Sequence, residues 1–198
     1  MTPSKKTSNR AAPKKIYQLL IALDEIQPTV WRRIWVADTL TLAKLDRVIQ
    51  AVMGWTNSHL HEFEIEGQRY GMLLPEEDGL DDNPPLDERR ARIGKVLGDD
   101  VNEFTYVYDF GDHWQHSVKV EMRMQPNDIN VWPTCLDGKN ACPPEDVGGT
   151  YGYTEFLEAI GDPTHEEHLA MWRWAGGPFD PHGFDVNAAN IALRNLRL

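Results

Sequence analysis

The sequence predicts a single α+β domain with a largely antiparallel sheet and packed helices. Two observations predict this fold class. Segments with the period-two alternation of strands come first and most helical segments come last, which is typical of α+β proteins rather than of alternating βαβ folds. The length of 198 residues suits one hydrophobic core, so we expect residues 15–198 to form one domain.

The chain starts with a basic segment. Five of its 20 basic residues precede the first acidic residue, namely Lys5, Lys6, Arg10, Lys14 and Lys15. Together with Ser, Thr and Pro they predict a disordered, solubilising tail over residues 1–14. The rest of the chain carries 15 basic against 31 acidic residues, a net charge of −16. Such a body repels a phosphate backbone, so we expect no specific binding of duplex DNA by the folded domain.

Two strands, Tyr17–Leu23 and Val30–Val36, are expected to form a hairpin, because apolar side chains alternate along both. In the second strand Trp31, Arg33 and Trp35 share one face. A half-buried guanidinium needs a flat neighbour and an acceptor. We therefore expect Arg33 to stack on an indole or to pair with one of the motif carboxylates described below.

A helix and a third strand are expected next. Apolar positions recur at helical spacing from Leu40 to Trp55, where Gly54 is expected to end the helix. The His59–Ile65 segment returns to period two and predicts a strand. Residues Pro75–Glu88 combine acidic residues with Pro and Gly and predict a mobile loop.

Two further strands, Phe104–Phe110 and Trp114–Met122, predict a second hairpin whose turn leaves two alternatives open. With a two-residue turn, Asp109 and His116 share a face, which suits acid–base work or metal binding. With a three-residue turn, His116 lies opposite the aromatic stripe of the first strand and packs in the core. Hydrophobic matching favours the three-residue turn.

The last part of the chain predicts a long loop followed by helices. Little periodicity and much Pro and Gly between Gln125 and Thr150 predict an ordered loop, and loops of this length often carry function. Helices are expected over Tyr153–Ile160, over Thr164–Trp174 with a capping box of Thr164 and Glu167, and over Val186–Leu196 behind an Asp185 cap.

Two histidine pairs have the spacing of metal ligands. His59 and His61 would lie on one strand face with Cα atoms about 6 to 7 Å apart, which is compatible with one ion. Because that face continues inward, one of the two also fits a core position. His165 and His168 are one helical turn apart, but their acidic neighbours predict an exposed, solvated face.

The cysteines and one acidic pair also have two interpretations. Cys135 and Cys142 form a zinc site only if His116 or His61 completes it, and otherwise fit free thiols in a reducing cytosol. Glu145–Asp146, ahead of two glycines, suits either metal ligation or helix capping. No run is apolar enough for a membrane span and no secretory signal is visible, so we expect a cytoplasmic protein.

Several common catalytic motifs do not occur. The sequence has no Gly-x-x-x-x-Gly-Lys-Ser/Thr loop, no Gly-x-Gly-x-x-Gly, no His-Glu-x-x-His and no Gly-x-Ser-x-Gly. Nucleotide hydrolysis, dinucleotide redox chemistry and serine hydrolysis therefore lack support.

Five ordered motifs carry a resemblance to a known family. They are Pro28–Arg33, Gly54–Trp55 with His59–Phe63, Tyr108–Asp112 with Trp114 and His116, Pro143–Gly149, and Gly177–Asp180 with Phe184–Asp185. In this order they resemble the plasmid pRiA4b ORF-3-like family, some members of which are labelled as resolvases or mobile-element passengers. The resemblance implies an α+β roll and an association with plasmid or mobile-element biology, without an established chemistry. By position, the polar motif residues are His61, Asp109, Asp112, His116, Glu145 and Asp146.

Two functions are compatible with these motifs. The first is a cytosolic binding or interaction module for an unknown protein or small ligand, rather than an enzyme. The alternative is a metal-dependent hydrolase or phosphodiesterase, with zinc or manganese bound among His61, His116, Asp112 and Glu145. In either case we expect the His59–Ile65 strand, the second hairpin and the Gln125–Thr150 loop to meet in space, because polar motifs cluster when they form one site.

Overall fold

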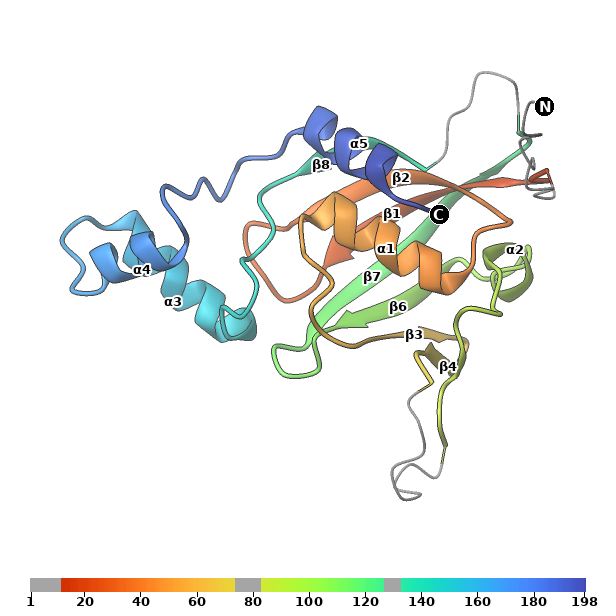
Figure 1. Ribbon diagram of the computed structural model, residues 1–198, viewed down its shortest axis with the longest axis horizontal. Helices are drawn as coiled ribbons and strands as arrows, with labels where there is room; N and C mark the ends of the chain where they lie inside the picture. Colours follow the sequence, from red (N-terminus) through yellow and green to blue (C-terminus); the bar gives the residue numbers. More distant parts are fainter. Residues whose placement is uncertain (1–11, 74–82, 127–132) are drawn as a thin grey trace, which may run out of the picture.

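The computed structural model describes residues 12–73, 83–126 and 133–198, whose strands form one eight-stranded sheet (Figure 1). The strands are β1 (Ile16–Leu23), β2 (Trp31–Ala37), β3 (His61–Ile65), β4 (Gln68–Gly71), β5 (Leu86–Asp87), β6 (Glu103–Tyr108), β7 (Trp114–Met124) and β8 (Thr134–Lys139), in the spatial order β5-β4-β3-β6-β7-β1-β2-β8. Every neighbouring pair is antiparallel except β4 and β5. The predicted fold class is confirmed.

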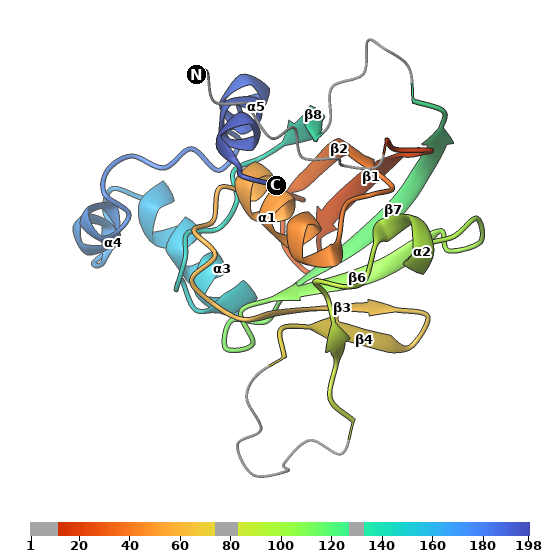
Figure 2. The same cartoon turned by 45° about the vertical axis from the view of Figure 1, so that its right-hand side comes forward.

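The helices lie on one face and at one end of this sheet. They are α1 (Leu42–Met53), α2 (Ile93–Val96), α3 (Gly149–Gly161), α4 (His168–Trp174) and α5 (Val186–Asn195). Helix α1 crosses the face of the sheet, whereas α3 and α4 extend beyond its end (Figures 1 and 2). No helix within the described ranges has the length and apolar character needed to cross a membrane.

The first hairpin and the first helix form as predicted. Strands β1 and β2 pair in antiparallel register, and their alternate side chains are buried. Helix α1 ends at Gly54, whose left-handed φ of 98° suits a residue without a side chain. Arg33 donates two hydrogen bonds to the Glu121 carboxylate, at 2.7 and 2.8 Å, and lies over the Trp31 ring. Its expected flat neighbour and acceptor are both present, although Glu121 lies outside the motifs.

Arg32 points to the opposite face of β2 and is buried without a carboxylate partner in the described part of the chain. Its guanidinium donates to the carbonyl oxygens of Val52, Trp31 and Lys139 at 2.8–2.9 Å and lies over the Phe184 ring. Burial lowers the pKa of this guanidinium. Arg32 therefore joins the end of α1, the β2–β8 pair and the segment before α5.

Two segments that the sequence predicts as loops contain strands. Strand β8 lies within the Gln125–Thr150 loop and pairs with β2, and β5 lies within the Pro75–Glu88 loop and pairs with β4. The predictions of loop structure were wrong for β5 and β8. Both strands form by pairing with a neighbouring strand, β4 or β2, and neither has a local apolar pattern that would predict it. Residues 75–82 and 127–132 of these loops, and residues 1–11 of the tail predicted over 1–14, lie outside the described residues.

The C-terminal helices confirm one predicted cap and correct another. The Asp185 side chain accepts hydrogen bonds from the first turn of α5, as predicted. Helix α4 instead starts at His168, and its N-cap residue Glu167 makes no side-chain capping bond. Thr164 donates to the Asp162 carboxylate in the turn before α4, so the expected capping box is absent.

Candidate functional site

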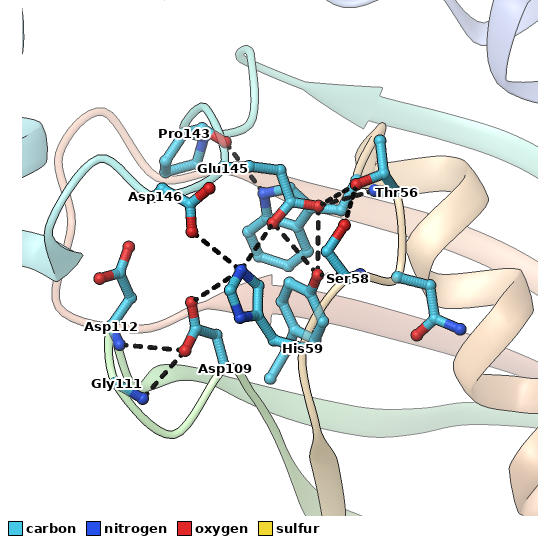
Figure 3. A network of polar contacts seen from close by, with 12 residues as sticks. Thr56, Ser58, His59, Asp109, Gly111, Asp112, Pro143, Glu145 and Asp146 are labelled. Carbon is cyan, nitrogen blue, oxygen red and sulfur yellow. Dashed lines mark hydrogen bonds and ion pairs between the residues drawn. The ribbon is translucent and has the colours of Figure 1, made fainter.

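The imidazole of His59 lies among three carboxylates from distant parts of the chain (Figure 3). Its Nε2 atom is 2.9 Å from Oδ1 of Asp146, 3.5 Å from Oδ2 of Asp109 and 4.0 Å from Oε2 of Glu145. This nitrogen is buried, yet within the described ranges no atom accepts a well-aligned hydrogen bond from it. The donor atoms of His59, Asp109 and Asp146 all lie within 4.8 Å of one another.

Two of these separations match those between ligands of one divalent cation. Donor atoms that bind an ion at about 2.1 Å are about 3.0 Å apart at right angles and about 3.4 Å apart in a tetrahedron. The two shortest contacts of His59 Nε2, 2.9 and 3.5 Å, fall close to these values. A hydrogen-bonded ion pair would instead align the ring N–H with one oxygen. One imidazole and two carboxylates suit zinc or manganese.

The conformation of Asp109 directs one of its oxygens to the site. Asp109 follows β6 with a left-handed φ of 56°, which Asp tolerates better than most residues. Its Oδ1 accepts a hydrogen bond from the backbone of Gly111 at 2.9 Å, and its own N–H donates to the carbonyl of Leu60. These bonds leave Oδ2 facing His59. Asp146 also has a left-handed φ, of 58°, and its side chain is 71% exposed, so it forms the solvent side of the site.

Glu145 fixes the loop that carries His59. Its Oε1 accepts hydrogen bonds from the backbone N–H and the hydroxyl of Thr56 at 2.7 and 2.9 Å, and from the Tyr108 hydroxyl at 3.1 Å. Burial and the nearby carboxylate raise the pKa of Tyr108 well above its usual value, so this hydroxyl stays protonated and donates. Next to it, the Trp55 indole donates to the carbonyl of Pro143. The Glu145 segment and the end of α1 are therefore joined at several points.

Asp112 orients α3 rather than contacting His59. Its Oδ2 accepts a hydrogen bond from the backbone N–H of Gly148 at 3.1 Å, directly before the helix. A Cβ on Gly149 would lie 2.7 Å from the carbonyl oxygen of Asp112, so the hairpin turn and the start of α3 are in close contact. This contact places Asp146 beside Asp109.

His61 belongs to a second, buried cluster. Its Nδ1 lies 3.2 Å from Asp46 and its Nε2 2.7 Å from Glu88, and all three side chains are buried. Burial lowers the pKa of His61, but the bond to Glu88 and the two negative charges raise it by more, so the net shift is upward. Tyr106 donates to Asp46 at 2.8 Å, while burial raises the Asp46 pKa. Asp46, Glu88 and Tyr106 were not predicted, because no local pattern connects them.

His116 is a core histidine. The observed register pairs Tyr106 with His116 and Tyr108 with Trp114, as the three-residue turn predicts. Its ring is fully buried against Trp55 and Tyr106, and burial lowers its pKa to about 4. Its Nδ1 lies 3.2 Å from the Tyr106 carbonyl.

The His59–Ile65 segment, the β6–β7 hairpin and the Gln125–Thr150 segment meet in space, as predicted. The histidine at their meeting point is His59 and not His61 or His116. The structure brings Asp109, Glu145 and Asp146 to His59, whereas His61 lies between Asp46 and Glu88. His116 and Asp112 likewise make the separate contacts described above. His59 was considered only as a partner of His61.

The other predicted metal ligands have different contacts. Burial raises the pKa of both free thiols, Cys135 and Cys142, and in the described part of the chain neither joins a group of three potential ligands. His165 accepts the backbone N–H of Glu167, and His168 lies 2.9 Å from the Ala159 carbonyl.

Comparison with known proteins agrees with this fold. A family model described as plasmid pRiA4b ORF-3-like protein matches residues 15–188. Uncharacterized protein y4hQ of Sinorhizobium fredii is 42% identical over 181 residues, which cover 91% of this chain and 89% of that protein. The crystal structure of a protein of unknown function, MM3350 from Methanosarcina mazei, matches with a TM-score of 0.80 and 37% identity, over 89% of this chain and 97% of that chain.

Proposed function

The chain belongs to the plasmid pRiA4b ORF-3-like family, and from that premise we propose that it is a binding module with a divalent cation held by His59, Asp109 and Asp146. The names of the relatives described above state no activity, so we base the proposal on the geometry of the site. Its main support is the buried Nε2 atom of His59, which faces two carboxylate oxygens at 2.9 and 3.5 Å without a well-aligned hydrogen bond. We assign Glu145 the role of positioning the loop, because its oxygens already accept several hydrogen bonds.

The backbone around the site supports the same assignment. Asp109 and Asp146 both have left-handed φ angles, which cost about 1 kcal/mol or more in an L-residue. Strained conformations of this kind persist where surrounding structure holds them, and they cluster at functional sites. Here they bring two carboxylates to one imidazole, an arrangement that a cation stabilises and that like charges otherwise disfavour.

The free cysteines and the net charge suggest the compartment and the kind of partner of this module. We place it in residues 15–198 and in the cytoplasm, because both cysteines are free thiols. Residues 16–198 carry a net charge of −16, which is unsuited to duplex DNA, so we propose a protein or a small ligand as the partner. A ligand with a carboxylate or phosphate group would complete the coordination of the ion.

Metal content of the full-length protein tests this function. After chelation and re-equilibration with zinc or manganese, we expect about one ion per chain, with affinity that rises with pH because the imidazole must be deprotonated to bind. Asp146→Asn should weaken binding at least tenfold, roughly the loss expected for a metal-site partner, without unfolding the protein because Asp146 is exposed.

The control is His165→Ala, which lies in the turn between α3 and α4 outside the proposed ligand set and should leave metal affinity unchanged. If the unsubstituted protein binds no ion, His59 is simply an ion-pair partner of Asp146 and the proposed cation site does not exist. Equal affinity in Asp146→Asn would have the same consequence.

A metal-dependent hydrolase or phosphodiesterase is the second candidate. The observation in its favour is that three protein ligands, one of them on the solvent side, leave positions on an ion open for water and substrate. Hydrolysis of bis-p-nitrophenyl phosphate by the zinc- or manganese-loaded protein tests it. Turnover that disappears in both His59→Gln and Asp146→Asn would favour the enzyme over the binding module.

A further inference from the structure

Helix α4 carries large apolar side chains that are not buried by the described chain. No residue of α4 is buried, and Leu169 and Trp172 are 62% and 43% exposed. Figure 2 shows α3 and α4 beyond the end of the sheet, away from the core between α1 and the strands. Exposed tryptophan at a projecting site is unusual for a surface without a partner, because tryptophan is enriched in the centres of protein interfaces.

The outer apolar face is separate from the contacts that hold α4 in place. On the inner side, Phe156 of α3 contacts the rings of Trp174 and Phe179, which connects the two helices to the following segment. Leu169 and Trp172 are three residues apart and so share a helical face. Neither takes part in the aromatic contacts that join α3 to α4. Both side chains therefore remain exposed while other residues connect α3 to α4.

The net charge of the α3–α4 segment indicates the chemistry of its partner. Residues 149–176 contain five carboxylates against one arginine, a net charge of −4; they are Glu155, Glu158, Asp162, Glu166, Glu167 and Arg173. A second copy of this chain would bring like charge to the contact, and an anionic membrane would be repelled for the same reason. A basic partner would instead be attracted and would associate faster.

We propose that the outer face of α4, formed by Leu169 and Trp172 and bordered by Glu166 and Glu167, docks a basic segment of another protein that carries large aliphatic side chains. The apolar pair supplies the buried centre of the contact, and the carboxylates supply its polar rim. This surface is independent of the cation site.

Binding of synthetic peptides to the full-length protein tests this surface, with tryptophan fluorescence and calorimetry as readouts. The probes are a helical-period peptide of leucine and lysine, the same peptide with glutamate for lysine, and a lysine, glycine and serine peptide of equal charge. We expect the leucine–lysine peptide to bind, more weakly at high salt, and the other two to bind at least about tenfold more weakly.

The matched variants are Leu169→Ser with Trp172→Ser on α4, and Ile191→Ser on α5, where Ile191 is similarly exposed at 53%. The α4 double variant should lose at least about tenfold in affinity with an unchanged melting temperature, whereas Ile191→Ser should keep full affinity. Equal loss in both variants, or none in the double variant, would overturn the proposal. Tight binding of the glutamate peptide, or self-association through the α4 face in light scattering, would overturn the basic partner.

Discussion

Replacing Glu88 by Gln is expected to lower the pKa of His61 and the free energy of unfolding together. Glu88 Oε2 lies 2.7 Å from His61 Nε2, and both side chains are about 5% exposed or less, so solvent screens the pair very little. At an effective dielectric constant of about 20 the attraction is about 6 kcal/mol, and desolvation offsets part of it. Because Gln keeps an acceptor in the same place, we expect a net loss of about 1.5–3 kcal/mol.

The pH dependence distinguishes a charged His61 from a neutral one. Burial lowers the pKa of His61, but the hydrogen bond between its Nε2 and Glu88 and the negative charge of Asp46, 3.2 Å from its Nδ1, outweigh burial and raise this pKa above its usual value of 6.5. A raised folded-state pKa means that the imidazolium stabilises the fold fully below about pH 6.5 and that this contribution is lost as the pH rises through the folded-state pKa. The difference between the parent and Glu88→Gln should therefore be largest near pH 6 and shrink in alkali.

Urea unfolding across this pH range and NMR titration of the His61 ring measure the two effects. Glu62→Gln is the control, because Glu62 pairs with Arg69 at the more exposed edge of the sheet and should cost less than about 1 kcal/mol. An unchanged His61 titration in Glu88→Gln, or a stability difference that is constant with pH, would refute the assignment of an imidazolium between two carboxylates.

Three further substitutions test the packing around the site. Arg32→Lys should cost about 3 kcal/mol in urea unfolding, because an ammonium group cannot reach all three carbonyls that the guanidinium binds. Gly149→Ala should cost about 2 kcal/mol, because φ is +67° and the new Cβ would lie 2.7 Å from the Asp112 carbonyl oxygen, whereas Gly161→Ala meets nothing within 4 Å and should be close to neutral. Asp185→Ala should lower the thermal stability by about 1 kcal/mol, because it removes the cap of α5.

The sequence predicts those helices and strands that bury one continuous apolar face. The register of β6 and β7 follows from matching Tyr106 and Tyr108 to His116 and Trp114, since a slip by one residue would turn the aromatic rings of one strand to the opposite face from those of the other. Helix α1 was equally clear, because its apolar stripe repeats for three turns and ends at Gly54. In both cases burial of one face decides the structure, and the sequence records that face directly.

Strand β8 shows where this kind of inference fails. Its sequence alternates poorly and contains Gly138, which weakens a predicted strand. The structure explains the glycine, because a Cβ there would lie 2.6 Å from the Phe184 ring and 2.9 Å from the Arg32 side chain. The strand therefore depends on packing against residues far away in the chain, which no local pattern can reveal.

A contact between residues far apart in the sequence also explains why His59 and His61 lie in different surroundings. Period two puts them on one face only if both lie in the strand, but β3 starts at His61. The preceding turn is held by Asn57, which has a left-handed φ of 58° and donates its N–H to the side chain of Gln50 in α1. Gln50 also donates to Tyr106, beside the buried His61 cluster. A core side chain of α1 thus sets the turn that directs His59 to the carboxylates and leaves His61 in the core.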